Sequence, residues 1–132
     1  MVNEINTAVD AYYNKFIMEE MENVDPEELD YTYVEEACQK ALEANPGNPR
    51  ALYHMALIKN KEIEYDAAIE YAEKALESET EPVWLSAINF ELGSAYQNTA
   101  EYEKACETLQ KVVEEPFLSR AERKMESIPG CN

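Results

Sequence analysis

The chain has 132 residues, of which 45% are hydrophobic and 30% are charged, so its size and composition fit one folded domain rather than a disordered segment. Acidic residues outnumber basic residues by 28 to 11 and give a net charge of −17. This charge disfavours binding to nucleic acid or to an anionic membrane surface. With three glycines and scattered prolines, the chain also lacks the many tight turns of a β-barrel or β-sandwich.

Seven helices are predicted from the hydrophobic periodicity, over residues 3–23, 26–44, 49–61, 65–78, 82–98, 101–114 and 119–127. Several segments between the predicted helices contain residues that start or stop a helix. Asn45-Pro46-Gly47 is a stop signal, and Asn48-Pro49 is a cap followed by proline in the first turn. Asp25-Pro26-Glu27-Glu28 and Ser119-Arg120-Ala121-Glu122 have the pattern of capping boxes. The predicted fold class is all-α.

The second, fourth and sixth predicted helices are copies of one amphipathic pattern. Counted from Tyr31, Tyr65 and Tyr102, small or apolar residues recur at offsets 3, 7, 10 and 11, whereas Lys and Glu recur at offsets 9 and 12. The apolar offsets fall on one stripe of an α-helix and the charged offsets fall away from it. We therefore expect the stripe to be buried and the charged residues to face solvent.

A helix pair repeated at intervals of 34 and then 37 residues resembles the tetratricopeptide repeat family, over roughly residues 15–119. The run from Tyr65 to Glu77 is similar to the family's second helix, and Leu92-Gly93 with Tyr96 is similar to its first. The resemblance implies a right-handed α-solenoid of antiparallel helix pairs. Ala68, Gly93 and Ala105 are expected where paired helices cross closely.

The resemblance also divides the single domain into units. Residues 49–81 and 82–116 are the second and third repeats, and residues 117–132 are a C-terminal capping helix and tail with Arg120, Arg123 and Lys124. Residues 1–48 are a divergent first repeat or an N-terminal cap, because Met21-Glu22 stands where a small residue is expected.

The function implied by the resemblance is a non-enzymatic adaptor or scaffold that binds a protein or peptide in a groove lined by the first helices. The implied groove residues are Arg50, Tyr53, His54, Leu57, Asn60, Lys61, Ala87, Phe90, Glu91, Ser94, Gln97 and Asn98, with Glu19, Glu20 and Asn23 as candidates from the first unit. Tyr53, Leu57 and Phe90 are expected either as exposed apolar contacts or, for Tyr53 and Phe90, as packing between neighbouring repeats.

The expected partner is an apolar, neutral or basic segment. Only Arg50, His54 and Lys61 supply positive charge to the predicted groove, so we do not expect the family's mode of gripping a C-terminal carboxylate. Residues 1–48 hold 12 acidic and 2 basic residues, which either steer a basic partner or form a solvated face. One alternative is self-association, through a terminal helix or through this acidic third meeting Arg120, Arg123 and Lys124. Another is a chaperone for an apolar or basic client segment.

The sequence has no motif of a catalytic, cofactor or metal site. It lacks a glycine-rich phosphate loop, GxSxG and HExxH, and His54 is its single histidine. Cys38, Cys106 and Cys131 are odd in number and far apart, which predicts three free thiols in a reducing compartment. Residues 1–6 do not resemble a signal peptide, and no uncharged stretch could span a bilayer. We therefore expect a cytoplasmic location.

Overall fold

The computed structural model describes residues 2–131, with side chains from residue 7 onward, and all the regular structure in this part is helical. The helices are α1 (Val2–Glu22), α2 (Thr32–Ala44), α3 (Pro49–Lys61), α4 (Tyr65–Ser78), α5 (Pro82–Asn98), α6 (Tyr102–Leu109) and α7 (Phe117–Glu126). The all-α prediction is confirmed, and α3, α4 and α5 have the predicted bounds. None of the helices in the described part of the chain is long and apolar enough to cross a membrane.

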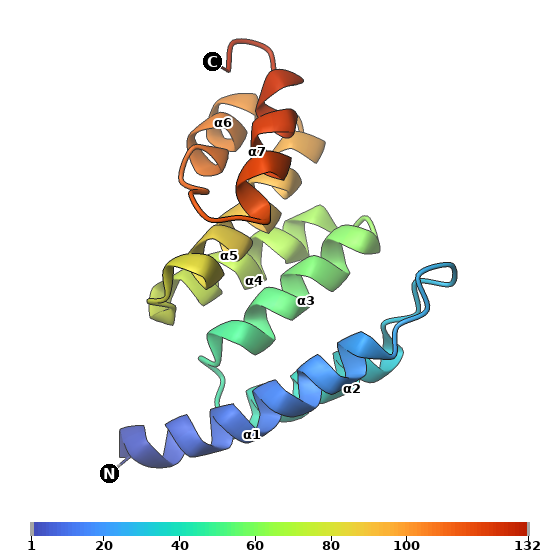
Figure 1. Ribbon diagram of the computed structural model, residues 1–132, viewed down its shortest axis with the longest axis vertical. Coiled ribbons are helices and arrows are strands. Elements are labelled where there is room, and N and C mark those ends of the chain that lie inside the picture. Colours follow the sequence, from blue (N-terminus) through green and yellow to red (C-terminus); the bar gives the residue numbers. More distant parts are fainter. Residues whose placement is uncertain (1, 132) are drawn as a thin grey trace.

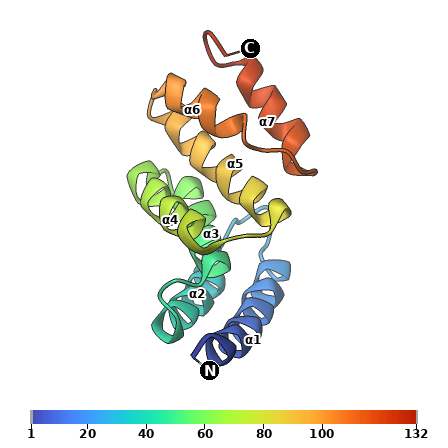
Figure 2. The same cartoon turned by 90° about the vertical axis from the view of Figure 1, so that its left-hand side faces the viewer.

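The helices form antiparallel pairs, α1 with α2, α3 with α4 and α5 with α6, and α7 follows the last pair. Figure 1 shows the pairs stacked along the long axis from α1 at one end to α7 at the other. In Figure 2, α2, α4 and α6 lie on one side of the stack, while α1 and α7 lie on the other. The stack is an α-solenoid. We call the surface formed by α1, α3, α5 and α7 the odd-helix face.

The repeated stripe forms the core, as its spacing predicts. The residues at offsets 3, 7 and 10 are all 2% exposed or less: Val34, Cys38, Ala41, Ala68, Ala72, Ala75, Ala105, Leu109 and Val112. Lys40, Lys74 and Lys111 at offset 9 are exposed. Three core clusters result, and each joins helices of neighbouring pairs. Burial of small residues thus holds adjacent units together.

Gly93 marks the closest approach of α5 to α6. A Cβ atom at this position would lie 2.6 Å from both Cγ and Cδ2 of Leu109. Since Leu109 is fully buried, its side chain has no open space into which it can move. The expectation of a small residue at this crossing is confirmed.

The predicted start of the second helix at residue 26 is wrong. Asp25 accepts a hydrogen bond from the Glu27 backbone and closes one short turn, after which Leu29 adopts a left-handed φ of 51°. This backbone conformation cannot continue a right-handed helix. The Asp30 carboxylate then accepts hydrogen bonds from both the backbone and the hydroxyl of Thr32, and α2 begins at Thr32.

The predicted junction between the last two helices is also wrong. α6 ends at Leu109 rather than at residue 114, because the backbone amides of Val113 and Glu114 donate to the Ser86 hydroxyl, each at 3.1 Å, instead of to helix carbonyls. Val113, predicted to lie on the buried stripe, is consequently 62% exposed. α7 begins at Phe117, and Ser119 caps nothing: its backbone amide and hydroxyl donate to the Glu115 carboxylate.

The prediction of three free thiols is wrong for two of the cysteines. Cys106 on α6 and Cys131, beyond the end of α7, form a disulfide bond. Cys38 is a free, buried thiol, and burial raises its pKa to about 12. The cysteine content therefore gives no support to a reducing compartment or to a cytoplasmic location.

Candidate functional site

Two hollows are lined entirely by residues of the odd-numbered helices. The N-terminal hollow, about 150 Å³ in volume, is lined by Asn14, Lys15, Ile17, Met18, Arg50, His54 and Trp84. The C-terminal hollow, about 180 Å³, is lined by Asn60, Lys61, Phe90, Glu91, Ser94, Asn98, Arg120 and Lys124. Every lining residue belongs to α1, α3, α5 or α7. The two hollows thus follow each other along one face of the array.

Aromatic rings and aliphatic side chains give the N-terminal hollow an apolar wall. The His54 ring lies 6.2 Å from the Trp84 ring, and Ile17 and Met18 of α1 complete the wall. Nδ1 of His54 lies 2.7 Å from the Arg50 carbonyl oxygen. Since a carbonyl only accepts hydrogen bonds, Nδ1 carries the proton. Burial lowers the pKa of His54 and favours the neutral ring.

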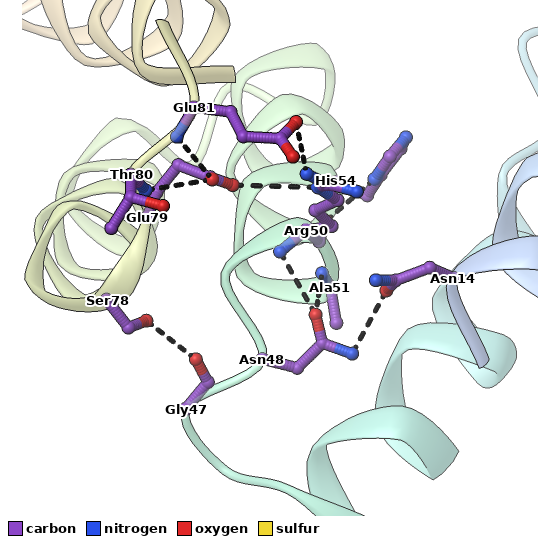
Figure 3. Close-up of polar contacts among 10 residues, drawn as sticks. All are labelled: Asn14, Gly47, Asn48, Arg50, Ala51, His54, Ser78, Glu79, Thr80 and Glu81. Atoms are coloured by element: carbon purple, nitrogen blue, oxygen red, sulfur yellow. Dashed lines mark hydrogen bonds and ion pairs between the residues drawn. The ribbon is translucent and has the colours of Figure 1, made fainter. Parts of the chain in front are cut away.

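A polar network at the start of α3 fixes the rim of the N-terminal hollow (Figure 3). Asn48 caps α3 by accepting from the backbone amides of Arg50 and Ala51, and its side-chain amide donates to Asn14 of α1 at 3.0 Å. The Arg50 guanidinium pairs with Glu81 at 2.7 Å and with Glu79 at 3.6 Å. It also stacks 4.7 Å above the Trp84 ring. Arg50 is therefore positioned rather than free to swing.

Two cationic side chains of α7 cover one side of the C-terminal hollow. The Arg120 guanidinium lies 4.6 Å from the centre of the Phe90 ring, and Lys124 lies 5.5 Å from it. The same ring faces Phe117 at 6.2 Å. As a result Phe90 is only 4% exposed. The face of α7 that packs on α5 thus forms part of this hollow.

A buried carboxylate lies at the base of the C-terminal hollow. The side-chain amide of Asn60 donates to the Glu91 backbone carbonyl at 3.0 Å and to its carboxylate at 2.7 Å. Burial raises the pKa of Glu91, against the opposing effects of the Asn60 bond and of the charges on Lys61, Arg120 and Lys124. The side-chain oxygen of Asn60 is buried and accepts no hydrogen bond from the described residues. A donor from a bound molecule would satisfy it.

The structure brings eight of the predicted groove residues to the two hollows. Arg50 and His54 line the N-terminal hollow. The C-terminal hollow takes Asn60, Lys61, Phe90, Glu91, Ser94 and Asn98. Ser94 is buried, and its hydroxyl donates to the Phe90 carbonyl at 2.7 Å.

The remaining predicted groove residues lie elsewhere. Ala87 is buried, Leu57 packs half-buried between two core clusters, and Gln97 donates to the Ser127 hydroxyl. The candidates from the first unit, Glu19, Glu20 and Asn23, line neither hollow.

Of the two alternatives for Tyr53 and Phe90, packing between neighbouring repeats is confirmed and exposure to solvent is wrong. Tyr53 is 6% exposed and contacts the Trp84 ring of the next pair at 5.7 Å. Phe90 is covered by α7 in the same way. Tyr53 and Phe90 are thus each covered by the odd-numbered helix that follows, as the continuous core of a repeat array requires.

Sequence reasoning missed the contributions of α1 and α7. The sequence does not show which residues of α1 face the groove, because the first unit lacks the small residue that sets the register in the other units. The lining residues missed in this way are Asn14, Lys15, Ile17 and Met18. Arg120 and Lys124 are spaced four residues apart, which places them on one side of a helix. That spacing was the available signal that they act together.

Comparison with known families assigns the central units. Residues 49–81 and residues 86–115 each match the tetratricopeptide repeat. The chain therefore contains two tetratricopeptide repeats. The two matched tetratricopeptide repeats contain the α3–α4 pair and most of the α5–α6 pair, including most of the C-terminal hollow. Repeats of this family support a general role as a protein–protein interaction scaffold. No curated protein matches the chain.

Proposed function

We propose that the chain is a non-enzymatic scaffold whose odd-helix face is the concave binding face of the array and takes a segment of another protein. The observation that carries the proposal is the common origin of the two hollows. All their lining residues come from four successive odd-numbered helices. A segment laid across these helices would contact both hollows, whereas the even-numbered helices lie behind them.

The chemistry of the hollows favours a segment that carries an apolar side chain and a hydrogen-bond donor. Ile17, Met18 and Trp84 offer apolar contact in the N-terminal hollow. In the C-terminal hollow, the unsatisfied oxygen of Asn60 needs a donor, which a backbone amide or a basic side chain supplies. The arrangement fits an extended peptide backbone.

The charge of the whole chain favours a neutral or basic partner. The net charge is −17, and 12 acidic residues lie in the first 48 positions against 2 basic ones. Such an excess speeds the approach of a positively charged segment and repels an acidic one. We propose a partner segment that is apolar with neutral or basic flanks.

Substituting exposed residues of both hollows should weaken capture of the partner. Met18→Glu puts a charge beside the apolar hollow, and Asn98→Trp fills the mouth of the other. We expect the double variant to retain about tenfold less partner than wild type, when immobilised protein captures partners from the native source and mass spectrometry quantifies them. Tyr53 and Phe90 are unsuitable for this test because truncating buried rings leaves cavities.

A matched control places the same residues on the even-numbered helices. Tyr33→Glu on α2 and Lys74→Trp on α4 alter exposed positions away from both hollows. This control variant should capture the partner as wild type does, with both variants checked for unchanged thermal unfolding. Equal losses in the two double variants, or none in either, would refute the assignment of the odd-helix face.

A further inference from the structure

A larger groove lies at the C-terminal end of the array, between α7 and the segment that follows α6 and apart from the two hollows. We call it the end groove. Its volume is about 740 Å³, and its apolar lining consists of Val112 and Val113, which follow α6, and Leu118 and Met125 of α7. Val113 is 62% exposed. Solvent-exposed apolar surface of this kind marks contact sites in soluble proteins.

The end groove exists because α7 has no partner helix among residues 2–131. α3 pairs with α4 and α5 pairs with α6, and each pair buries an apolar stripe. One side of α7, with Phe117 and Ala121, packs into the core shared with α5. Leu118 and Met125, seven residues apart, line the end groove, and Met125 also packs against the edge of the third core cluster.

The rim of the end groove is acidic. Glu122 and Glu126 of α7 line it and are exposed. The basic residues Arg120 and Lys124 of the same helix lie toward the C-terminal hollow, where they cover Phe90. Glu122 and Glu126 thus border the end groove, whereas Arg120 and Lys124 border the C-terminal hollow.

We propose that the end groove binds an amphipathic α-helix from a partner protein, with an apolar stripe flanked by lysine or arginine. A helix fits because α4 and α6 already pack in this way against the odd-numbered helices that precede them. Basic flanks fit because Glu122 and Glu126 border the apolar lining. This interaction is independent of the segment proposed for the odd-helix face.

Binding of a designed peptide to the full chain tests this interaction. The probe is a fluorescein-labelled helical peptide of about 18 residues with leucines at helical spacing and flanking lysines, titrated by fluorescence anisotropy. Val113→Asp should weaken binding about tenfold or more, because it places a charge in the apolar contact. The control Ile63→Asp makes the same change at a residue that is 72% exposed and outside the end groove, and it should bind the probe as wild type does.

A second pair of variants separates local from long-range attraction. Glu122→Lys with Glu126→Lys should weaken binding about fivefold. Glu19→Lys with Glu22→Lys changes the net charge equally at exposed residues of α1 and should have less effect. The proposal would be overturned if Val113→Asp bound the probe as tightly as Ile63→Asp and the Glu122/Glu126 variant bound it as tightly as the Glu19/Glu22 variant. It would also be overturned if wild type bound a scrambled peptide as tightly as the probe. Sedimentation showing a wild-type dimer that Val113→Asp dissociates would overturn it too, because the occupant would then be a second copy of the chain.

Discussion

Replacing Cys106 and Cys131 together with alanine should lower the free energy of unfolding by about 2–4 kcal/mol. The bond joins α6 to the segment after α7 across a sequence separation of 25 residues. Opening this loop gives the unfolded chain more conformations. The folded chain in turn loses the tether that holds Ile128 and Cys131 in the third core cluster. Urea unfolding of the variant and of oxidised wild type measures the difference.

The free thiol provides the control for this prediction. Wild type and Cys38→Ala should both be less stable after reduction, because Cys38 takes no part in the bond. The Cys106→Ala/Cys131→Ala variant should unfold at the same urea concentration with or without reductant. If reductant leaves the wild-type midpoint unchanged, the two cysteines do not cross-link the folded chain.

Gly93→Val should lower the free energy of unfolding by about 2–3 kcal/mol. The new Cβ would meet Leu109 at 2.6 Å, and Leu109 is enclosed by the third core cluster. α5 and α6 must therefore separate, or Leu109 must adopt an unfavourable rotamer. Thermal or urea unfolding measures the loss.

A second glycine shows whether the effect comes from the crossing. A Cβ at Gly47 would have one neighbour within 4 Å, Oδ1 of Asn45 at 3.6 Å, and Gly47 is exposed. Gly47→Val should change stability by no more than about 0.5 kcal/mol. Adding Leu109→Ala should cost less in Gly93→Val than in wild type, because the truncation relieves the clash. If the losses of stability from Gly93→Val and Leu109→Ala simply add, the cost of Gly93→Val does not come from its contact with Leu109.

The helical repeat could be predicted from the sequence because its information is local and recurs. Each copy places small residues at the same offsets, as in Val34, Ala68 and Ala105, and these residues are buried. The Asn48-Pro49 cap could also be predicted, since both of its hydrogen bonds fall within three residues. Periodicity and capping residues describe contacts of this range well.

The start of α2 and the end of α6 could not be predicted, because contacts or backbone angles outside those patterns decide them. Val112 and Val113 continue the apolar period of α6, but Ser86, 27 residues before Val113, takes the amides that would extend the helix. The Asp25-Pro26 pattern is compatible both with a turn and with the start of a helix. The left-handed conformation of Leu29 decides for a turn.

The site could be predicted only where the repeat pattern sets the positions. Asn60 and Glu91 lie in neighbouring repeats, and both line the C-terminal hollow. The cover that Arg120 and Lys124 place over Phe90 depends on how α7 docks against α5. That docking is a tertiary contact between two helices, and the hydrophobic periodicity of neither helix predicts it.

Site-specific photo-cross-linking tests most directly whether the odd-helix face is the recognition surface. A photoreactive phenylalanine derivative is placed at Met18 or Asn98 on the odd-helix face, or at the exposed Lys40 or Lys74 on α2 and α4. Each protein is then irradiated in extract from the native source. We predict that a partner is captured covalently from positions 18 and 98 and not from positions 40 and 74. Capture of the partner from positions 40 and 74 alone would contradict the account.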